Sequence, residues 1–100
     1  MIRGTTPTHT FTLPFNTDIL SDIRVIYAQD DEVLFVKRKE DCILRDDCII
    51  INLTQEDTFM FDSNKKVQIQ VRVLTAKGEV LSSVIENIGV SQCLEDEVLQ

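Results

Sequence analysis

The residue types that commonly perform catalysis are few in this chain. His9 is the only histidine, and a hydrolase of the Ser-His-Asp type would need it beside a nucleophile and an orienting carboxylate. No Gly-x-Ser-x-Gly turn accompanies it, and no glycine-rich loop is present to hold a phosphate. The neighbouring carboxylates Glu56 and Asp57 are consecutive, which is a poor arrangement for acid and base groups that must converge on one substrate. We therefore expect a protein that is not an enzyme and binds no cofactor.

The sequence also lacks the spacing of a metal site. Asp30, Asp31 and Glu32 are consecutive, whereas a calcium loop places its acids at alternate positions around a central glycine. These three acids are more typical of a solvated hairpin turn.

The three cysteines indicate neither a zinc site nor a disulfide framework. Cys42, Cys48 and Cys93 are odd in number and form no CxxC pair. Cys42 and Cys48 are close enough in sequence to face each other across a turn and to pair under oxidation. A reducing cytoplasm is the simpler environment for this chain.

Length and charge limit the function further. One hundred residues with 43% hydrophobic content predict a single domain that can fill a core. The formal net charge of -7 would repel a phosphate backbone, so we expect no nucleic-acid partner. No stretch approaches the roughly 20 apolar residues that span a bilayer, and the segment from Met1 to Pro14 does not have the apolar run of a secretion signal. We expect no contact with a membrane.

One basic cluster is a candidate protein-binding site. Lys37, Arg38 and Lys39 are consecutive, and strand alternation would place Lys37 and Lys39 on one face. A charged edge strand that resists aggregation is the structural explanation. The alternative is a docking patch for the acidic C-terminal segment or for an acidic surface of another copy.

The C-terminal segment is the second candidate. Residues 94–100 contain Leu94, Val98 and Leu99 beside three acidic residues, and we expect them to form an acidic tail or a short helix. The three apolar side chains would be the anchors of a protein contact.

Hydrophobic alternation predicts an antiparallel β-protein. The expected strands have a period of two or a continuous β-branched run, and they are Thr8 to Leu13, Asp22 to Gln29, Val33 to Lys39, Cys48 to Leu53, Val67 to Thr75 and Glu79 to Glu86. The run from Cys48 to Leu53 is apolar on both faces, which favours a central strand. Ile43 to Arg45 either continues the strand before it or forms a short one. Ile69 and Val71 should face the interior.

The segments between these strands contain turn residues. Gln29 to Glu32 predicts a hairpin, and Ala76 to Gly78 predicts a second one in which Gly78 supplies a positive φ. Thr54 to Thr58 is either an irregular corner or one helical turn capped by Thr54 with Asp57 at the reciprocal position. We favour the corner.

Six to eight short strands at this spacing predict an all-β fold, an antiparallel immunoglobulin-like β-sandwich of about seven strands. A small barrel is the alternative. We expect residues 1–93 to form the single domain and residues 94–100 to form the tail.

Several segments together resemble a family of small proteins encoded among the structural genes of prophages in gut Firmicutes, and they cover nearly the whole chain. The segments are Met1 to His9, Arg24 to Gln29, Leu53 to Thr58, Val67 to Arg72 and Cys93 to Leu99. A Leu-Thr-x-Glu-Asp-Thr corner before a long valine-rich strand and a glycine hairpin is also similar to the N-terminal sandwich module of phage upper-baseplate proteins. Those proteins continue into a long C-terminal portion, and this chain ends at Gln100. No functional residues can be transferred from either group.

The resemblance implies a non-enzymatic prophage structural or assembly protein of the tail or baseplate region. Its partners would be copies of itself, in a homo-oligomer, or other virion proteins. It would be found in the bacterial cytoplasm during assembly and then in the virion. The alternative is a soluble β-sandwich binding module that captures a host protein or peptide by strand addition.

Overall fold

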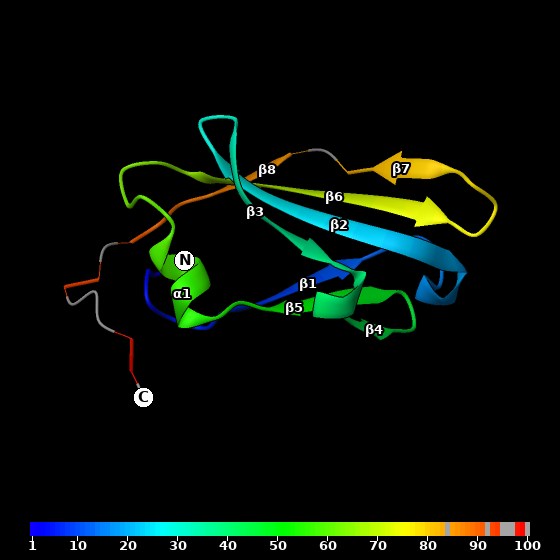
Figure 1. Ribbon diagram of the computed structural model, residues 1–100, viewed down its shortest axis with the longest axis horizontal. Helices are drawn as coiled ribbons and strands as arrows, with labels where there is room; N and C mark the ends of the chain where they lie inside the picture. Colours follow the sequence, from blue (N-terminus) through cyan, green and yellow to red (C-terminus); the bar gives the residue numbers. More distant parts are fainter. Residues whose placement is uncertain (84, 92, 95–97, 100) are drawn as a thin grey trace.

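The computed structural model shows two packed antiparallel sheets (Figure 1). It describes residues 1–83, 85–91, 93–94 and 98–99. The strands in this part of the chain are β1 (Thr8–Thr12), β2 (Leu20–Gln29), β3 (Glu32–Arg38), β4 (Ile43–Arg45), β5 (Cys48–Asn52), β6 (Val67–Thr75), β7 (Val80–Ser82) and β8 (Glu86–Ile88). The helices are the 3₁₀ turns η1 (Thr17–Ile19) and η2 (Lys39–Asp41) and the short α1 (Gln55–Phe59). The predicted all-β sandwich is confirmed.

The strand order is that of an immunoglobulin-like sandwich. One sheet has the order β1-β5-β4, and the other has the order β3-β2-β6-β7, with β8 also paired to β6. These orders match strands B, E and D of an immunoglobulin domain in one sheet and strands C′, C, F and G in the other. The position next to β1, where strand A of such a domain would pair, is not filled by a strand among the described residues. As the sequence predicted, β5 is a central strand.

Both predicted hairpins are confirmed. β2 and β3 pair across a two-residue turn in which Asp30 and Asp31 have φ values of 50° and 62°. Both φ values are positive, as a type I′ turn requires, and Asp is one of the few residues that accept this conformation. In the second hairpin Gly78 has φ of 90°, where a side chain would be strained.

The returning strand of the second hairpin differs from the prediction of one strand over residues 79–86. β7 ends at Ser82, and β8 begins at Glu86. Between them, the Ser83 backbone N–H donates to the Val71 carbonyl, and the Ser83 hydroxyl accepts from the Val71 N–H at 2.9 Å. This hydroxyl takes the place of a ladder carbonyl, so the strand is interrupted where it crosses the middle of β6.

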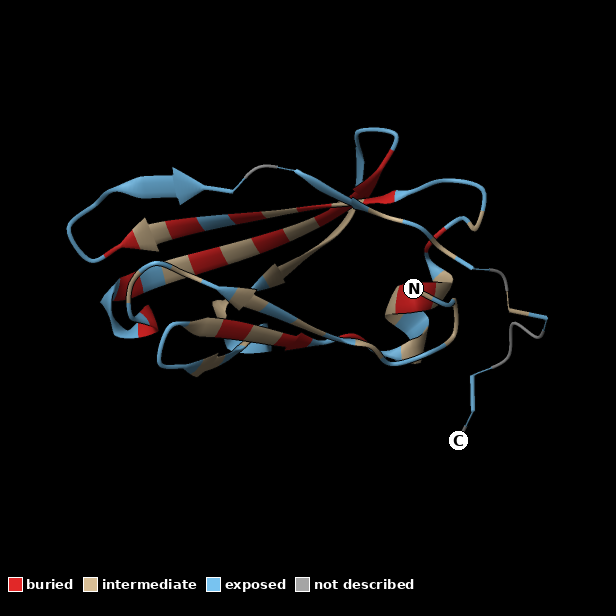
Figure 2. Ribbon diagram, turned by 180° about the vertical axis from the view of Figure 1, so that it is seen from behind, coloured by how far each residue is buried: buried red, intermediate tan, exposed pale blue. Residues whose placement is uncertain are grey.

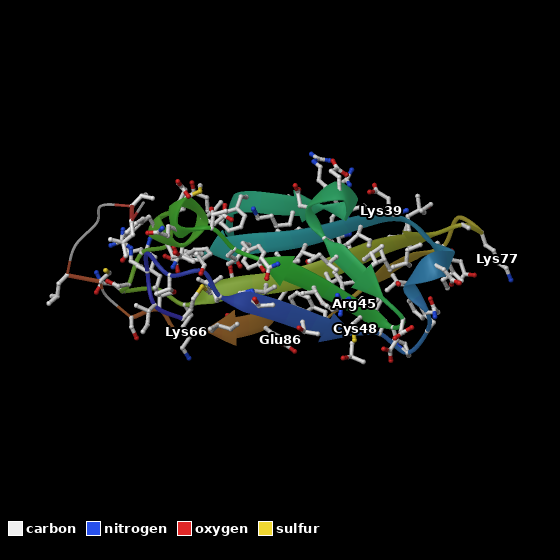
Figure 3. The ribbon with its side chains drawn as sticks, turned by 90° about the horizontal axis from the view of Figure 1, so that it is seen from below. Lys39, Arg45, Cys48, Lys66, Lys77 and Glu86 are labelled. Atoms are coloured by element: carbon white, nitrogen blue, oxygen red, sulfur yellow. The ribbon has the colours of Figure 1, made fainter. Side chains whose placement is uncertain are left out.

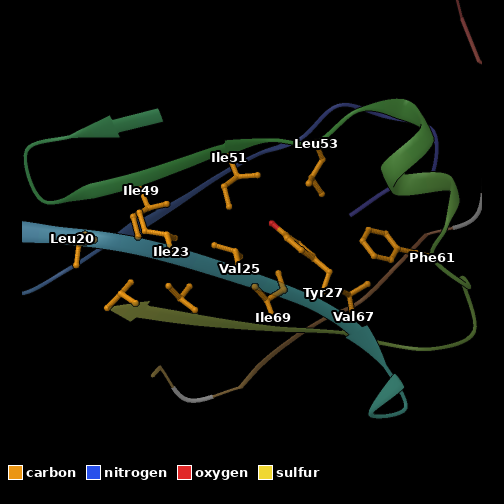
Figure 4. Close-up of a cluster of buried hydrophobic side chains, with 12 residues drawn as sticks. Leu20, Ile23, Val25, Tyr27, Ile49, Ile51, Leu53, Phe61, Val67 and Ile69 are labelled. Carbon is orange, nitrogen blue, oxygen red and sulfur yellow. The ribbon is translucent and has the colours of Figure 1, made fainter. Parts of the chain in front are cut away.

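The core lies between the sheets and follows the predicted alternation. β2 and β6 are banded in Figure 2 because buried and less buried side chains alternate along β6 and along most of β2. Ile69 and Val71 face the interior, with exposed fractions of 3% and 6%. The aromatic part of the core stacks Tyr27 on Phe35, with ring centroids 4.8 Å apart, and packs both rings against Phe61. Figure 4 shows Tyr27 and Phe61 within the core.

The preference for an irregular corner at Thr54 to Thr58 was wrong, because the segment forms α1. The Thr54 hydroxyl accepts from the Asp57 N–H at 3.1 Å, and the Asp57 carboxylate accepts from the Thr54 N–H at 2.9 Å. This reciprocal capping box satisfies two backbone donors that a helix start leaves unpaired. The buried Thr58 hydroxyl also donates to the Thr5 carbonyl and accepts from the Gly4 N–H, so α1 holds the N-terminal segment in place.

Cys42 and Cys48 do not form a disulfide in the structure. The Cys42 thiol donates to the Arg38 carbonyl at 3.1 Å, and the Cys48 thiol donates to the Asp47 carboxylate at 3.4 Å. Burial, and then the neighbouring carboxylates of Asp41 and Glu40, raise the pKa of Cys42 to about 11. The formation of a disulfide between Cys42 and Cys48 under oxidation stays a prediction. Among the described helices, none has the length and apolar character needed to cross a membrane.

Candidate protein-binding groove

The border of the smaller sheet at β1 is open. Within the part of the chain that the structure describes, β1 pairs with a strand on one side only, and that strand is β5. The bonds from Leu13 N–H to the Asp47 carbonyl and from Leu53 N–H to the Pro7 carbonyl show that odd-numbered residues of this segment turn their backbone groups toward β5. The N–H and C=O groups of Thr8, Thr10 and Thr12 consequently point away from β5, because these groups alternate in direction along a strand.

A groove runs along this open border, between β1 and the border of the other sheet. Three adjoining hollows of about 430, 280 and 540 Å³ form it, and each shares lining residues with the next. Figure 3 shows β1 in blue beside β8, which contains Glu86. The apolar side chains in the groove are Phe11, Leu13, Phe15, Ile69, Val71, Val73, Leu81 and Ile88. An extended segment laid along β1 would therefore meet backbone partners on one side and apolar side chains on the other.

His9 lies on the inner face of β1, where it contacts the buried Tyr27. Its Nδ1 is 2.8 Å from the hydroxyl of the buried Tyr27, and the two rings are stacked with centroids 5.8 Å apart. Burial, and next the positive N-terminus, lower the pKa of His9 below 6.5. Burial, and next the Cys42 thiolate that forms at high pH and the Asp57 carboxylate, raise the pKa of Tyr27. A neutral imidazole that faces a neutral hydroxyl can accept its hydrogen bond, so the pair satisfies the polar end of a buried tyrosine.

The opposite side of the sandwich is closed by an ion pair that includes a predicted binding residue. Lys37 points inward from β3, and its Nζ lies 2.8 Å from Asp57 at the start of α1. The exposed fractions of the two side chains are only 19% and 16%. The Lys37 ammonium also lies 5.3 Å from the centre of the Phe35 ring. The positive charge of Lys37 is thus paired with Asp57 within the fold.

The other predicted binding residues belong to two separate parts of the chain, η2 and the C-terminal segment. Lys39 lies in η2, and its Nζ donates to the Leu20 carbonyl at 3.1 Å. Leu94 is fully exposed, and Val98 and Leu99 are exposed to 37% and 74%. The backbone of Leu99 exchanges two hydrogen bonds with the Gln55 side chain on α1. The acids at 95–97 and Gln100 lie outside the described residues.

From the sequence, neither His9 with Asp57 nor the acids at 30–32 were expected to perform chemistry, and the described structure does not join either group into a site. The His9 side chain bonds to the Tyr27 hydroxyl, while Asp57 bonds to Lys37 and Thr54. No cluster of three histidine, cysteine, aspartate or glutamate side chains with metal-binding geometry occurs among the residues that the structure describes. Sequence reasoning missed the groove, because it depends on which strands pair. The threonines at alternate positions of β1 were its only signal.

In comparisons with protein-family models, curated proteins and solved structures, no match to this chain was found.

Proposed function

We propose that this chain is a non-enzymatic structural or assembly protein of a phage particle, which binds other polypeptides by strand addition along β1. The observation behind the binding mode is the open border of β1 above an apolar groove. A row of unpaired backbone groups is a template for another strand. Main-chain hydrogen bonds would supply affinity, and the apolar groove would select the side chains of the partner.

The partner segment should be extended, with apolar side chains at alternate positions. Such a strand can place one set of side chains against the groove while its backbone pairs with Thr8, Thr10 and Thr12. Because the chain has a net charge of -7, a neutral or basic segment would associate faster than an acidic one. This description fits a strand of another virion protein or of a second copy.

The phage assignment comes from the sequence resemblance, and the binding mode comes from the geometry of β1. A soluble module that captures a host protein or peptide by strand addition is the second candidate function, because the same open border serves both. Mass spectrometry of purified particles separates the two. A structural protein should be present at a fixed ratio to the other particle proteins, whereas a host-directed module should be absent.

Thr10→Pro tests the binding mode. Proline removes the N–H that points to the open border, and it is tolerated on an edge strand when that N–H faces solvent. The variant should fold, with an unfolding temperature close to that of the parent. Its abundance in purified particles should fall at least about tenfold, because the added strand loses a central hydrogen bond and collides with the proline ring.

Thr10→Val is the matched control, since it keeps the N–H and the strand propensity. It should enter particles at the parental level. Normal incorporation of folded Thr10→Pro would show that β1 is not the binding strand, and absence of the parent chain from particles would remove the phage assignment.

A further inference from the structure

Three of the five arginines form one row across the outer face of the larger sheet. Arg24 on β2 is directly opposite Arg38 on β3 and Arg72 on β6. Like charges in opposite positions destabilise a sheet. Asp22 pairs with Arg24 at 2.6 Å, but within the described residues no carboxylate pairs with the guanidinium of Arg38 or Arg72. The row therefore leaves positive charge unbalanced in a chain whose net charge is -7.

The next rows on the same face are apolar or neutral. Ile26 is opposite Val36 and Gln70, and the following row contains Ala28, Val33 and Gln68. Val33 in this row is an apolar side chain that is 56% exposed. A shallow hollow of about 150 Å³ lies here, lined by Ile26, Val33 and Ile85 among others.

The far end of this face is acidic. Asp30 and Asp31 form the β2–β3 turn, which rises on the side of the sheet away from β1, β4 and β5 (Figure 1). Gln68 holds Asp31 in place, because its side chain donates to the Asp31 carboxylate at 2.9 Å and accepts from the Asp31 N–H at 2.8 Å. Lys65 pairs with Asp30, whose side chain is 70% exposed.

We propose that this outer face, which runs from the arginine row through Ile26 and Val36 to the Asp30–Asp31 turn, binds the same face of a second copy. A two-fold axis that crosses the strands near the row of Ile26 and Gln70 reverses the strand direction of the partner. The arginine row of each copy then faces the acidic turn of the other. Ile26 and Val36 meet their own counterparts at the centre.

The register of the sheet supports this pairing. On β6, Arg72 and Gln68 are each two residues from Gln70, which is about 7 Å at the rise of a β-strand. The two-fold axis therefore places Arg72 near Gln68 of the other copy, and Asp31 is hydrogen bonded to that glutamine. Arg72 and Asp31 form the pair that occurs twice in the dimer.

The dimer should be weak and sensitive to salt. The face spans four strands of about 4.8 Å spacing and about seven residues along β2, which places the buried area at the low end for specific complexes. Charge pairs at such an interface are screened, since the Debye length falls to about 3 Å in 1 M salt. A second copy is a better fit than an unrelated acidic protein, because the same face has the arginine row at one end and the acidic turn at the other. A two-fold axis brings these opposite ends together.

Sedimentation equilibrium of the purified chain under reductant tests the inference. The parent should show a monomer–dimer equilibrium that shifts to monomer in 1 M NaCl. Arg72→Glu should raise the dimer dissociation constant at least about tenfold, because each dimer gains two repulsive contacts. Asp31→Asn, which keeps the turn preference, should weaken the dimer in the same direction. The double variant Arg72→Glu with Asp31→Lys restores opposite charges and should recover most of the affinity.

Lys77→Glu is the matched control, because it makes the same change of net charge in the β6–β7 loop and should leave the dimer unchanged. A parent that stays monomeric at every concentration would overturn the inference, as would failure of the double variant to recover affinity beyond Arg72→Glu alone. Association that Thr10→Pro abolishes and Arg72→Glu does not would place the contact at β1. That result would support strand addition and reject the outer face.

Discussion

Replacing Asp57 with alanine is expected to lower the free energy of unfolding by about 2–4 kcal/mol. The substitution removes one half of the capping box of α1, because the Asp57 carboxylate accepts from the Thr54 N–H. It also leaves the Lys37 ammonium without its partner in a site where the lysine is only 19% exposed. Chemical denaturation monitored by circular dichroism would measure the change.

Two further variants separate these contributions. Asp57→Asn keeps an oxygen that can accept from the Thr54 N–H but removes the charge, so it isolates the ion pair and should cost less than alanine. Glu56→Ala, at the exposed neighbouring position, should change stability by less than about 0.5 kcal/mol. If Asp57→Ala were as mild as Glu56→Ala, the ion pair and the cap would contribute nothing to the fold.

Titration of the Asp57 carboxylate should also make the free energy of unfolding depend on pH. Burial by itself would raise the pKa of Asp57, but hydrogen bonds from Lys37 and Thr54 outweigh it, and the folded pKa lies below 3.8. The unfolded chain therefore binds the proton first as the pH falls. The contribution of Asp57 is complete above the unfolded pKa and is lost as the pH falls through the folded pKa. The loss of stability in acid should be smaller in Asp57→Asn than in the parent.

Ile69→Ala should also cost about 2–4 kcal/mol, because it leaves a cavity between the two sheets. Ile69 is 3% exposed and belongs to the central cluster of the core. Equilibrium denaturation in urea measures the effect, and the loss would be a large share of the roughly 5–15 kcal/mol that holds such a domain together.

Gln70→Ala is the adjacent control on the opposite face of β6. Its side chain makes one hydrogen bond, to the Ser83 carbonyl, so its loss should cost less than about 1 kcal/mol. If Gln70→Ala were the more damaging of the two, the two faces of β6 would have been assigned in reverse.

The local pattern of polar and apolar residues was sufficient to predict most strands and both hairpins. β6 is an example, because its valines and isoleucine alternate with polar residues and the period of two allows only one division into faces. The acidic pair at the first hairpin turn and Gly78 at the second have the positive φ values that their residue types favour. The choice at Thr54 failed because a one-turn helix has too few residues for a periodic signal, and its capping box was the deciding feature.

The two proposed binding surfaces could not be predicted from the local pattern of the sequence. The open border of β1 exists because β1 pairs with β5, which is about 40 residues away in sequence, and no local pattern encodes that choice. Similarly, the arginine row becomes visible only when Arg24, Arg38 and Arg72 are aligned by the register of three strands. Lys37 was taken for a surface charge because its reach to Asp57 depends on where α1 packs.

Site-specific photo-cross-linking tests strand addition most directly. A benzophenone side chain is placed at Thr10 on the open border, and, as a control, at Arg45 on the far border of the same sheet, during particle assembly in the bacterium that encodes the chain. We expect an adduct from position 10 with one protein that co-purifies with particles, and a much weaker adduct from position 45. Equal adducts from both positions, or none from position 10 in assembled particles, would contradict it.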